Sequence, residues 1–287
     1  MAACAATPSA TETPQGPAAA AAPTSEAGRT KTDWAAAVSV EAEALQAAHP
    51  GAEVRIAVLD DCGQAVLARH GDIDVAKPTG SSIKPLAIHA ALGLGLDPAL
   101  EVDASAPLKV GDETIKDSRN NGVLSLSEAI AKSSNIAVAR ALQTVDWKEA
   151  YARVGTLVSL PSPEGLSLRD AIGQLDGFKT TVPLHELVSA YAQMASTSHG
   201  EAVLDMLRLA VTPEGTGSAA VVEGLEVLGK TGTSRIDDVQ GAVFVGRVRD
   251  GEKSAWIGVS VHGVAEDAYG GTVCAPAFAH IAKAVLR

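Results

Sequence analysis

The sequence predicts an α+β fold built on an antiparallel sheet, and two observations carry this prediction. Strand-like runs lie near both ends of the folded region, whereas the long stretch between them has apolar residues at helical spacing. Consecutive strands that are joined by short turns pair most simply in antiparallel fashion. We therefore expect a five-stranded antiparallel sheet flanked by N- and C-terminal helices, with a mainly helical subdomain at about residues 81–211.

The N-terminal part of the chain is predicted to change from a linker to a folded domain at residue 33. Residues 1–32 are rich in Ala, Pro, Thr and Ser and poor in large hydrophobic side chains, which is typical of a disordered linker. Asp33 is the expected N-cap of a first helix, which ends at His49-Pro50-Gly51. Two short apolar runs at 54–59 and 65–68 then predict a hairpin.

The rest of the chain is predicted to be helical first and then to supply the remaining strands. Four segments have apolar residues three and four positions apart and are expected to be helices: 83–94, 127–142, 183–195 and 202–209. Three strand-like runs follow, at 226–231, 241–248 and 254–261, and a last amphipathic helix is expected at 276–286. The sequence contains no repeat of fixed period, so we expect residues 33–287 to form a single domain.

The composition weighs against several classes of function. The chain has 287 residues, of which 46% are hydrophobic and only 3% aromatic, and its formal net charge is -11. An acidic chain with few aromatic side chains lacks both the positive surface and the stacking platforms that nucleic-acid binding needs. We therefore expect no nucleic-acid partner. The longest nearly apolar stretch, 87–96, is too short to span a bilayer.

The three cysteines, Cys4, Cys62 and Cys274, have neither C-x-x-C nor zinc-type spacing. We expect no metal site and no disulfide framework, and we leave Cys62 and Cys274 unpaired. Ala2-Ala3-Cys4 is similar to the end of a bacterial lipobox, although the apolar stretch that should precede it is missing and residues 1–29 contain no readable export signal. Cys4 is therefore either a candidate membrane anchor or an accidental cysteine of the tail.

Ser81 and Lys84 form the first candidate catalytic pair. They lie three residues apart where a helix is expected to start, so their side chains share one face. A serine hydroxyl becomes a good nucleophile when a base takes its proton, and a lysine whose pKa is lowered can be that base. Backbone N–H groups at a helix start also favour a developing oxyanion. Taken alone, the pattern favours a capped helix with a solvated lysine.

Two further short motifs can carry chemistry. Ser133-Ser134-Asn135 interrupts an apolar helical pattern, and buried polar groups need a reason, of which a cleft is one. The other Ser-x-Asn match, Ser118-Arg119-Asn120, lies in a polar loop. Lys230-Thr231-Gly232-Thr233 ends a strand-like run, where Gly232 would let another chain segment or a ligand approach the backbone. A plain exit from strand to turn would give the same pattern.

Taken together and in this order, the three motifs resemble the active-site set of penicillin-binding proteins and serine β-lactamases. Their surroundings are similar to the transpeptidase domain of penicillin-binding proteins in particular, at 80–85, 126–135 and 229–234. Framework segments are similar as well, at 181–192, 215–217, 242–246 and 270–278. The resemblance covers about residues 52–287 and implies a β-lactamase/transpeptidase-like fold.

The resemblance implies a DD-transpeptidase that acts on the D-Ala-D-Ala end of peptidoglycan stem peptides. Ser81 would attack the peptide carbonyl, with Lys84 taking its proton, to give an acyl-enzyme. Ser133 would relay a proton to the departing D-Ala, with Asn135 and Lys84 holding that network. β-Lactams would be covalent inhibitors, and no metal or organic cofactor is implied.

The same resemblance assigns the third motif to substrate binding. Lys230, Thr231 and Thr233, on either side of Gly232, would face the terminal carboxylate of the substrate. Backbone N–H groups of Ser81 and Thr233 would form the oxyanion hole. The substrate implies a location outside the cytoplasm, in the periplasm or on the outer face of the cytoplasmic membrane, although no signal peptide is readable.

The motifs leave the fate of the acyl-enzyme open. An amine acceptor would make the protein a transpeptidase, and water would make it a DD-carboxypeptidase or, acting on a β-lactam adduct, a serine β-lactamase. The Glu-x-x-Leu-Asn loop of class A β-lactamases is not matched, because Glu164-Gly165-Leu166-Ser167 is out of register and lacks Asn. Asn135 also departs from the Ser-x-Val of class D enzymes. A catalytically degenerate binding homologue is the remaining alternative.

Overall fold

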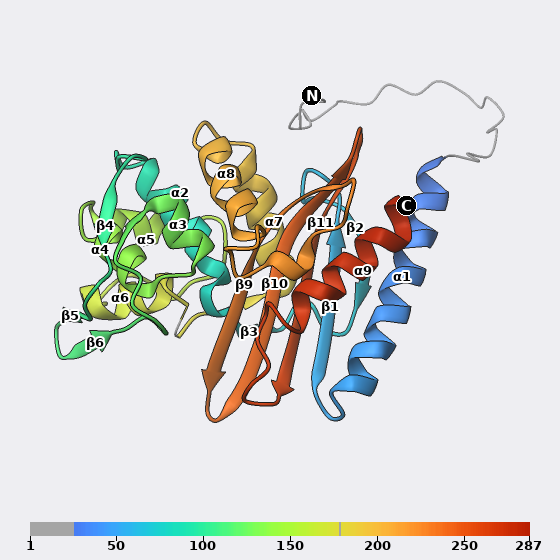
Figure 1. Ribbon diagram of the computed structural model, residues 1–287, viewed down its shortest axis with the longest axis horizontal. Coiled ribbons are helices and arrows are strands. Elements are labelled where there is room, and N and C mark those ends of the chain that lie inside the picture. Colours follow the sequence, from blue (N-terminus) through green and yellow to red (C-terminus); the bar gives the residue numbers. More distant parts are fainter. Residues whose placement is uncertain (1–25, 178) are drawn as a thin grey trace, which may run out of the picture.

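The computed structural model describes residues 26–177 and 179–287 and has the expected α+β architecture (Figure 1). Its centre is a five-stranded antiparallel sheet with the strand order β2-β1-β11-β10-β9. The strands are β1 (Glu53–Leu59), β2 (Val66–His70), β9 (Glu226–Ile236), β10 (Val239–Asp250) and β11 (Lys253–Val264). The predicted fold class is therefore confirmed.

The sheet joins the two ends of the folded chain. β1 pairs with β11 in antiparallel register from Glu53 opposite His262 to Leu59 opposite Trp256. Neighbouring residues of β10 face opposite sides, since Val243 and Val245 contact the helical subdomain whereas Phe244 faces the other layer. Both faces of the sheet are covered, which explains why its central strands read as continuous apolar runs.

Helices α1 (Glu26–Ala48) and α9 (Cys274–Leu286) lie side by side on one face of the sheet (Figure 1). Trp34 and Val38 of α1 and Phe278 of α9 are buried in this layer, where the Phe278 ring meets Phe244 edge-on at 5.0 Å. The first helix begins at Glu26 rather than at the N-cap expected at Asp33. Because no proline follows Pro23 before the helix, nothing in the backbone stops it from extending upstream.

The other face of the sheet carries the helical subdomain, with α7 packed on β1 and β11. Its helices are α2 (Lys84–Leu92), α3 (Leu126–Ala131), α4 (Asn135–Leu142), α5 (Trp147–Gly155), α6 (Leu168–Leu175), α7 (Leu184–Ala195) and α8 (Gly200–Ala210), with 3-10 turns η1 (Gly80–Ile83) and η2 (Ser218–Ala220). Three small ribbons pair β3 (Ala76–Pro78) with β8 (Thr181–Pro183), β4 (Glu101–Asp103) with β7 (Val123–Ser125), and β5 (Leu108–Val110) with β6 (Glu113–Ile115). None of the helices in the described part of the chain is long and apolar enough to cross a membrane.

Several expected elements differ in the structure. The helix expected at 127–142 is two helices, α3 and α4, because Ser133 between them adopts a left-handed φ of 58°. The strand expected at 226–231 continues through the Lys230-Thr231-Gly232-Thr233 segment, and helices α5 and α6 and the small ribbons were not predicted.

The structure describes two of the three cysteines, and they differ in whether they form a disulfide bond. Cys274 is free and buried, as expected, whereas Cys62, which we left unpaired, is disulfide-bonded. Residues 1–25 lie outside the described part of the chain. They include the candidate anchor Cys4 and most of the predicted linker, so both stay predictions.

Candidate active site

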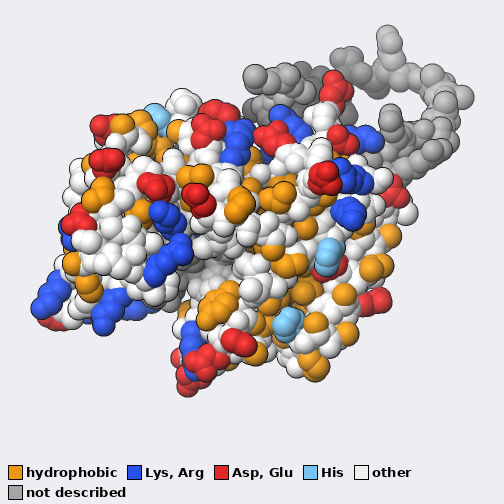
Figure 2. Space-filling model, in the orientation of Figure 1, with side chains coloured by type: hydrophobic (Ala, Val, Ile, Leu, Met, Phe, Trp, Pro, Cys, Tyr) orange, Lys and Arg blue, Asp and Glu red, His pale blue; other side chains and the backbone are white. Residues whose placement is uncertain are grey.

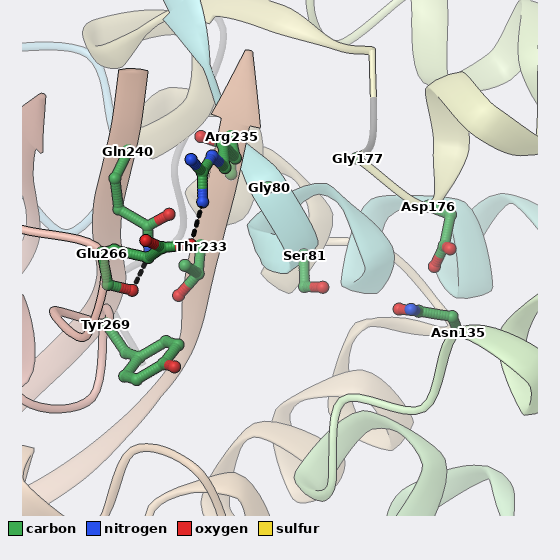
Figure 3. Close-up of a pocket in the computed structure, with 11 residues that line it drawn as sticks. Gly80, Ser81, Asn135, Asp176, Gly177, Thr233, Arg235, Gln240, Glu266 and Tyr269 are labelled. Atoms are coloured by element: carbon green, nitrogen blue, oxygen red, sulfur yellow. Dashed lines mark hydrogen bonds and ion pairs between the residues drawn. The ribbon is translucent and has the colours of Figure 1, made fainter. Parts of the chain in front are cut away.

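A cavity of about 400 Å³ lies between the helical subdomain and the β9 edge of the sheet. Figure 2 shows the surface hollowed between this subdomain and the turn that joins β9 to β10. Ser81 lies in the middle, with Asn135 and Asp176 on one side and Thr233 on the other (Figure 3). The complete lining is Gly80, Ser81, Asn135, Asp176, Gly177, Thr233, Ser234, Arg235, Gln240, Glu266 and Tyr269.

Ser81 is held by the backbone of its own turn. It lies in the 3-10 turn η1, directly before α2, rather than in the first turn of an α-helix as expected. Gly80 has a φ of 52° and lies so close to β9 that a Cβ there would be 2.5 Å from the Thr233 nitrogen. Within the described residues, the Ser81 hydroxyl has no hydrogen-bond partner, so it is available to a ligand in the cavity.

Lys84 opens α2 with a side chain that is 0% exposed. Its Nζ donates to the backbone oxygen of Ser133 at 2.9 Å and to Oδ1 of Asn135, and it lies 2.9 Å from Oδ1 of Asp176. Two of these oxygens accept hydrogen bonds from Lys84, and the third, on Asp176, forms an ion pair with it. The expected meeting of Lys84 with the Ser133-Ser134-Asn135 motif is therefore seen, and Asp176 is an additional partner.

Ser133 connects Lys84 with Lys230. The Lys230 Nζ donates to Ser133 Oγ at 2.9 Å and to its neighbour's carbonyl oxygen, that of Thr231, at 3.0 Å. Burial, assisted by the charge of Lys84, holds the pKa of Lys230 well below its ordinary value, and Asp176 partly opposes this shift. The left-handed backbone of Ser133 costs about 1–2 kcal/mol, which the contacts on both sides of this residue offset.

Asp117, which the sequence analysis did not select, positions the second motif. Its Oδ1 accepts hydrogen bonds from the backbone N–H groups of Asn135 at 2.6 Å and Ile136 at 3.1 Å. Its Oδ2 accepts from the Ser134 hydroxyl at 2.6 Å. The Asn135 amide nitrogen donates to the Lys116 oxygen at 2.8 Å, which turns Oδ1 of Asn135 toward Lys84. A carboxylate at the start of α4 also suits the positive end of the helix dipole.

Asp176 is the second functional candidate that the sequence analysis missed. It caps the C-terminus of α6, and its side chain is 0% exposed. Burial raises the pKa of its carboxyl group, while the Lys84 ammonium opposes that rise. The next residue, Gly177, packs closely on the turn that carries Ser81, since a Cβ there would lie 1.9 Å from the Gly80 oxygen. An acid before a glycine is too common in sequences to have indicated this placement.

The third motif lies along edge strand β9, and its residues have different surroundings. The Thr231 and Thr216 hydroxyls share a hydrogen bond of 2.6 Å. Gly232 packs on the turn that carries Ser81, where a Cβ would lie 2.1 Å from the Thr79 oxygen. Of the three residues predicted to bind substrate, Thr233 alone lines the cavity, and its Oγ1 accepts a hydrogen bond from the Gly270 N–H at 3.2 Å.

The outer wall beside Thr233 is polar and charged. Arg235 and Glu266 form an ion pair there, visible in Figure 3. Gln240 donates to the backbone oxygens of Glu266 at 3.2 Å and Ala268 at 3.0 Å, which fixes the segment that carries Tyr269. Within residues 26–177 and 179–287, no group of three or more His, Cys, Asp or Glu side chains is placed to hold a metal ion.

This chain is similar to known proteins in the sequence of its C-terminal part and in its fold. Residues 187–283 match the family model of the penicillin binding protein transpeptidase domain. A structure described as a peptidoglycan glycosyltransferase from Burkholderia ambifaria is 22% identical, with a TM-score of 0.78 over 89% of this chain and 94% of that one. The apo TP domain of penicillin-binding protein 3 from Burkholderia pseudomallei is 20% identical, with a TM-score of 0.79 over 91% of this chain and 94% of that one.

Proposed function

From the confirmed resemblance to transpeptidase domains of penicillin-binding proteins, we propose that this protein is a DD-transpeptidase that works through an acyl-enzyme on Ser81. The observation that carries the proposal is the network behind the cavity. Lys84 and Lys230 are both buried, and both contact Ser133, one through its backbone oxygen and the other through its hydroxyl. Two buried lysines that both contact Ser133, next to the unpartnered hydroxyl of Ser81, suit proton transfer around a reacting carbonyl.

Acylation uses the residues of this network in sequence. Ser81 Oγ forms a bond to the carbonyl carbon of a D-Ala-D-Ala peptide, and Lys84 takes the hydroxyl proton. Ser133 passes a proton to the nitrogen of the departing D-Ala as the peptide bond breaks. Backbone N–H groups of Ser81 and Thr233 stabilise the developing oxyanion.

The substrate's carboxylate would bind beside Thr233. This hydroxyl lines the cavity, whereas the hydroxyl of Thr231 is engaged by Thr216. Lys230 lies behind Ser133 and donates a hydrogen bond to its hydroxyl. The substrate would be a peptidoglycan stem peptide, which places the activity outside the cytoplasm, and β-lactams would acylate the same serine.

Covalent capture of benzylpenicillin tests the nucleophile. We expect intact-protein mass spectrometry to find one penicilloyl group on the wild type and none on Ser81→Ala. Ser118→Ala is the matched control, because Ser118 begins the other Ser-x-Asn motif but is exposed in a loop. An equal adduct on Ser81→Ala would contradict the assignment of the nucleophile. A wild type that neither carries an adduct nor consumes penicillin would support the degenerate homologue instead.

The fate of the natural acyl group needs a second assay. The protein is incubated with a stem-peptide analogue that ends in D-Ala-D-Ala and with an added D-amino acid. Transfer exchanges the terminal D-Ala for the added amino acid, whereas hydrolysis only shortens the peptide. Mass spectrometry of the products separates the transpeptidase from the DD-carboxypeptidase.

A further inference from the structure

Lys84, the proposed base, is engaged by groups other than the hydroxyl of Ser81. Its Nζ donates hydrogen bonds to the backbone oxygen of Ser133 and to Oδ1 of Asn135, and it lies 2.9 Å from Oδ1 of Asp176. The Ser81 hydroxyl has no hydrogen-bond partner within the described residues. In this structure, therefore, no hydrogen bond joins the base to the hydroxyl whose proton it would take.

Asp176 is the charged member among these three partners of Lys84. The side chains of Asp176 and Lys84 are both 0% exposed, and neither carboxylate oxygen has a hydrogen-bond partner within the described residues. The charge of the carboxylate is therefore balanced chiefly by the ammonium group 2.9 Å away. Removing one charge of a buried ion pair is costly, because the other charge is left uncompensated. The pair thus favours the protonated form of Lys84.

A protonated lysine cannot serve as the base of the acylation step. An ammonium group has three donors and no acceptor, so Nζ of Lys84 must first lose a proton to solvent before it can take the hydroxyl proton of Ser81. Lys230 shows the contrasting case, because it is equally buried but contacts a hydroxyl and a carbonyl oxygen instead of a carboxylate. Burial and the charge of Lys84 hold the pKa of Lys230 well below its ordinary value. The carboxylate beside Lys84 is what distinguishes the two lysines.

The backbone fixes Asp176 relative to the turn that carries Ser81. Asp176 caps the C-terminus of α6, and the next residue, Gly177, packs so closely on Gly80 that a Cβ there would lie 1.9 Å from the Gly80 oxygen. Figure 3 shows the Asp176 carboxylate set apart from Ser81, on the other side of the cavity. A movement of the Lys84 side chain toward Ser81 therefore lengthens the ion pair, which the fixed carboxylate resists.

We propose that Asp176 restrains the proposed base: its ion pair keeps Lys84 protonated and directed away from Ser81, so that the free protein acylates slowly. The inference rests on the proposed function and deepens it, because it names a residue outside the three sequence motifs that sets the rate of acylation. Asp176 acts through Lys84 and is therefore a positioning residue. Removal of its charge should speed the reaction, whereas removal of a residue that supports the base would slow it.

The test compares the rate at which benzylpenicillin acylates the wild type and Asp176→Asn, followed by intact-protein mass spectrometry. Asparagine keeps the size of the side chain and removes its charge. We expect the variant to acylate at least about 10-fold faster at about pH 7, which is a part of the about 10²–10⁴-fold that a general base contributes. Glu164→Gln is the matched control, because it removes an exposed carboxylate in the loop before α6, and it should acylate as the wild type does. A folded Asp176→Asn that acylates no faster than the wild type would overturn the proposal.

The pH dependence of acylation separates this role from a purely structural one. The charged groups that face Asp176 are Lys84, Lys230 and Asp117, and all three remain in Asp176→Asn. Because Lys84 loses its proton more readily without the carboxylate, the rise of the acylation rate with pH should occur at lower pH in the variant than in the wild type. A change of packing alone would alter the rate without moving this rise. Profiles that coincide in their pH dependence would overturn the proposal.

The wild-type profile tests the inference even if Asp176→Asn does not fold. A base that is held in its protonated form by an ion pair gives a rate that rises with pH, so we expect acylation of the wild type to become at least about 10-fold faster between about pH 6 and about pH 9. A rate that is constant over this range would overturn the proposal. Failure of the proposed function looks different, because the wild type would then form no adduct and consume no penicillin at any pH.

Discussion

His262 should make the fold sensitive to mild acid. This residue of β11 is only 6% exposed and lies opposite Glu53 of β1 and Gly241 of β10. Its Nε2 has no hydrogen-bond partner within the described residues. Burial, together with the charges of Arg55 and Lys77, lowers the pKa of His262 from 6.5 to about 4.

The magnitude follows from this shift. The folded pKa is about 2.5 units below the ordinary value, and each unit corresponds to 1.36 kcal/mol, which gives about 3 kcal/mol. Between about pH 6.5 and pH 4 the unfolded chain binds a proton on this histidine that the folded chain does not. The stabilisation is therefore fully present above about pH 6.5 and is lost as the pH falls toward 4.

The assay is urea unfolding at pH 7 and at pH 4, followed by circular dichroism. We expect the free energy of unfolding of His262→Gln to fall less on acidification than that of the wild type, by about 3 kcal/mol. His280→Gln is the control, because the His280 side chain is 67% exposed. This substitution should leave the pH dependence of the free energy of unfolding unchanged. If wild type and His262→Gln lose the same stability between the two pH values, the reasoning from burial is refuted.

Two further predictions concern the backbone and the loop that hold the site. Gly232→Ala should reduce the rate of penicillin acylation at least about 10-fold, because its Cβ would lie 2.1 Å from the Thr79 oxygen and force β9 away from η1, whereas Gly155→Ala has open space and should acylate normally. An unchanged rate in Gly232→Ala would argue against this contact. Asp117→Ala should lower the free energy of unfolding by about 2 kcal/mol, measured by urea unfolding, because two N–H groups and the Ser134 hydroxyl lose their charged acceptor. Exposed Asp112 provides the control Asp112→Ala, and equal stability of the two variants would contradict the assigned role.

The sequence could locate only those site residues that belong to a motif within one short stretch of chain. Ser81 and Lys84 are three positions apart, and the strands around them have clear apolar runs, so the motif and the sheet were both predictable. Asp117 and Asp176 were not, because each acts on residues far along the chain and no short pattern encodes such contacts. The structure alone brings Asp176 to Lys84.

The predicted ends of a strand and of a helix were wrong at positions where the backbone is left-handed and the sequence carries none of the residues that usually mark such a turn. β9 and β10 are joined through Asp237 and Asp238, which have φ values of 49° and 62°. Such left-handed hairpin turns usually carry Asn-Gly or Asp-Gly, so an Asp-Asp pair did not mark the turn, and the strand was ended too early. Ser133 is similar, since a left-handed serine within an apolar helical pattern gives no sign that the helix breaks there.

The contacts of Gly177 with Gly80 and of Gly232 with Thr79 place three stretches of main chain against one another without side chains between them. The spacing between Ser81 and β9 is therefore set by peptide dimensions, which are almost invariant. Substitutions that repack either hydrophobic layer would alter the stability of the protein well before they alter this spacing. Under the proposed function, adaptation to a different acyl donor would be confined to the outer wall, where Arg235, Glu266 and Tyr269 can change without moving Ser81.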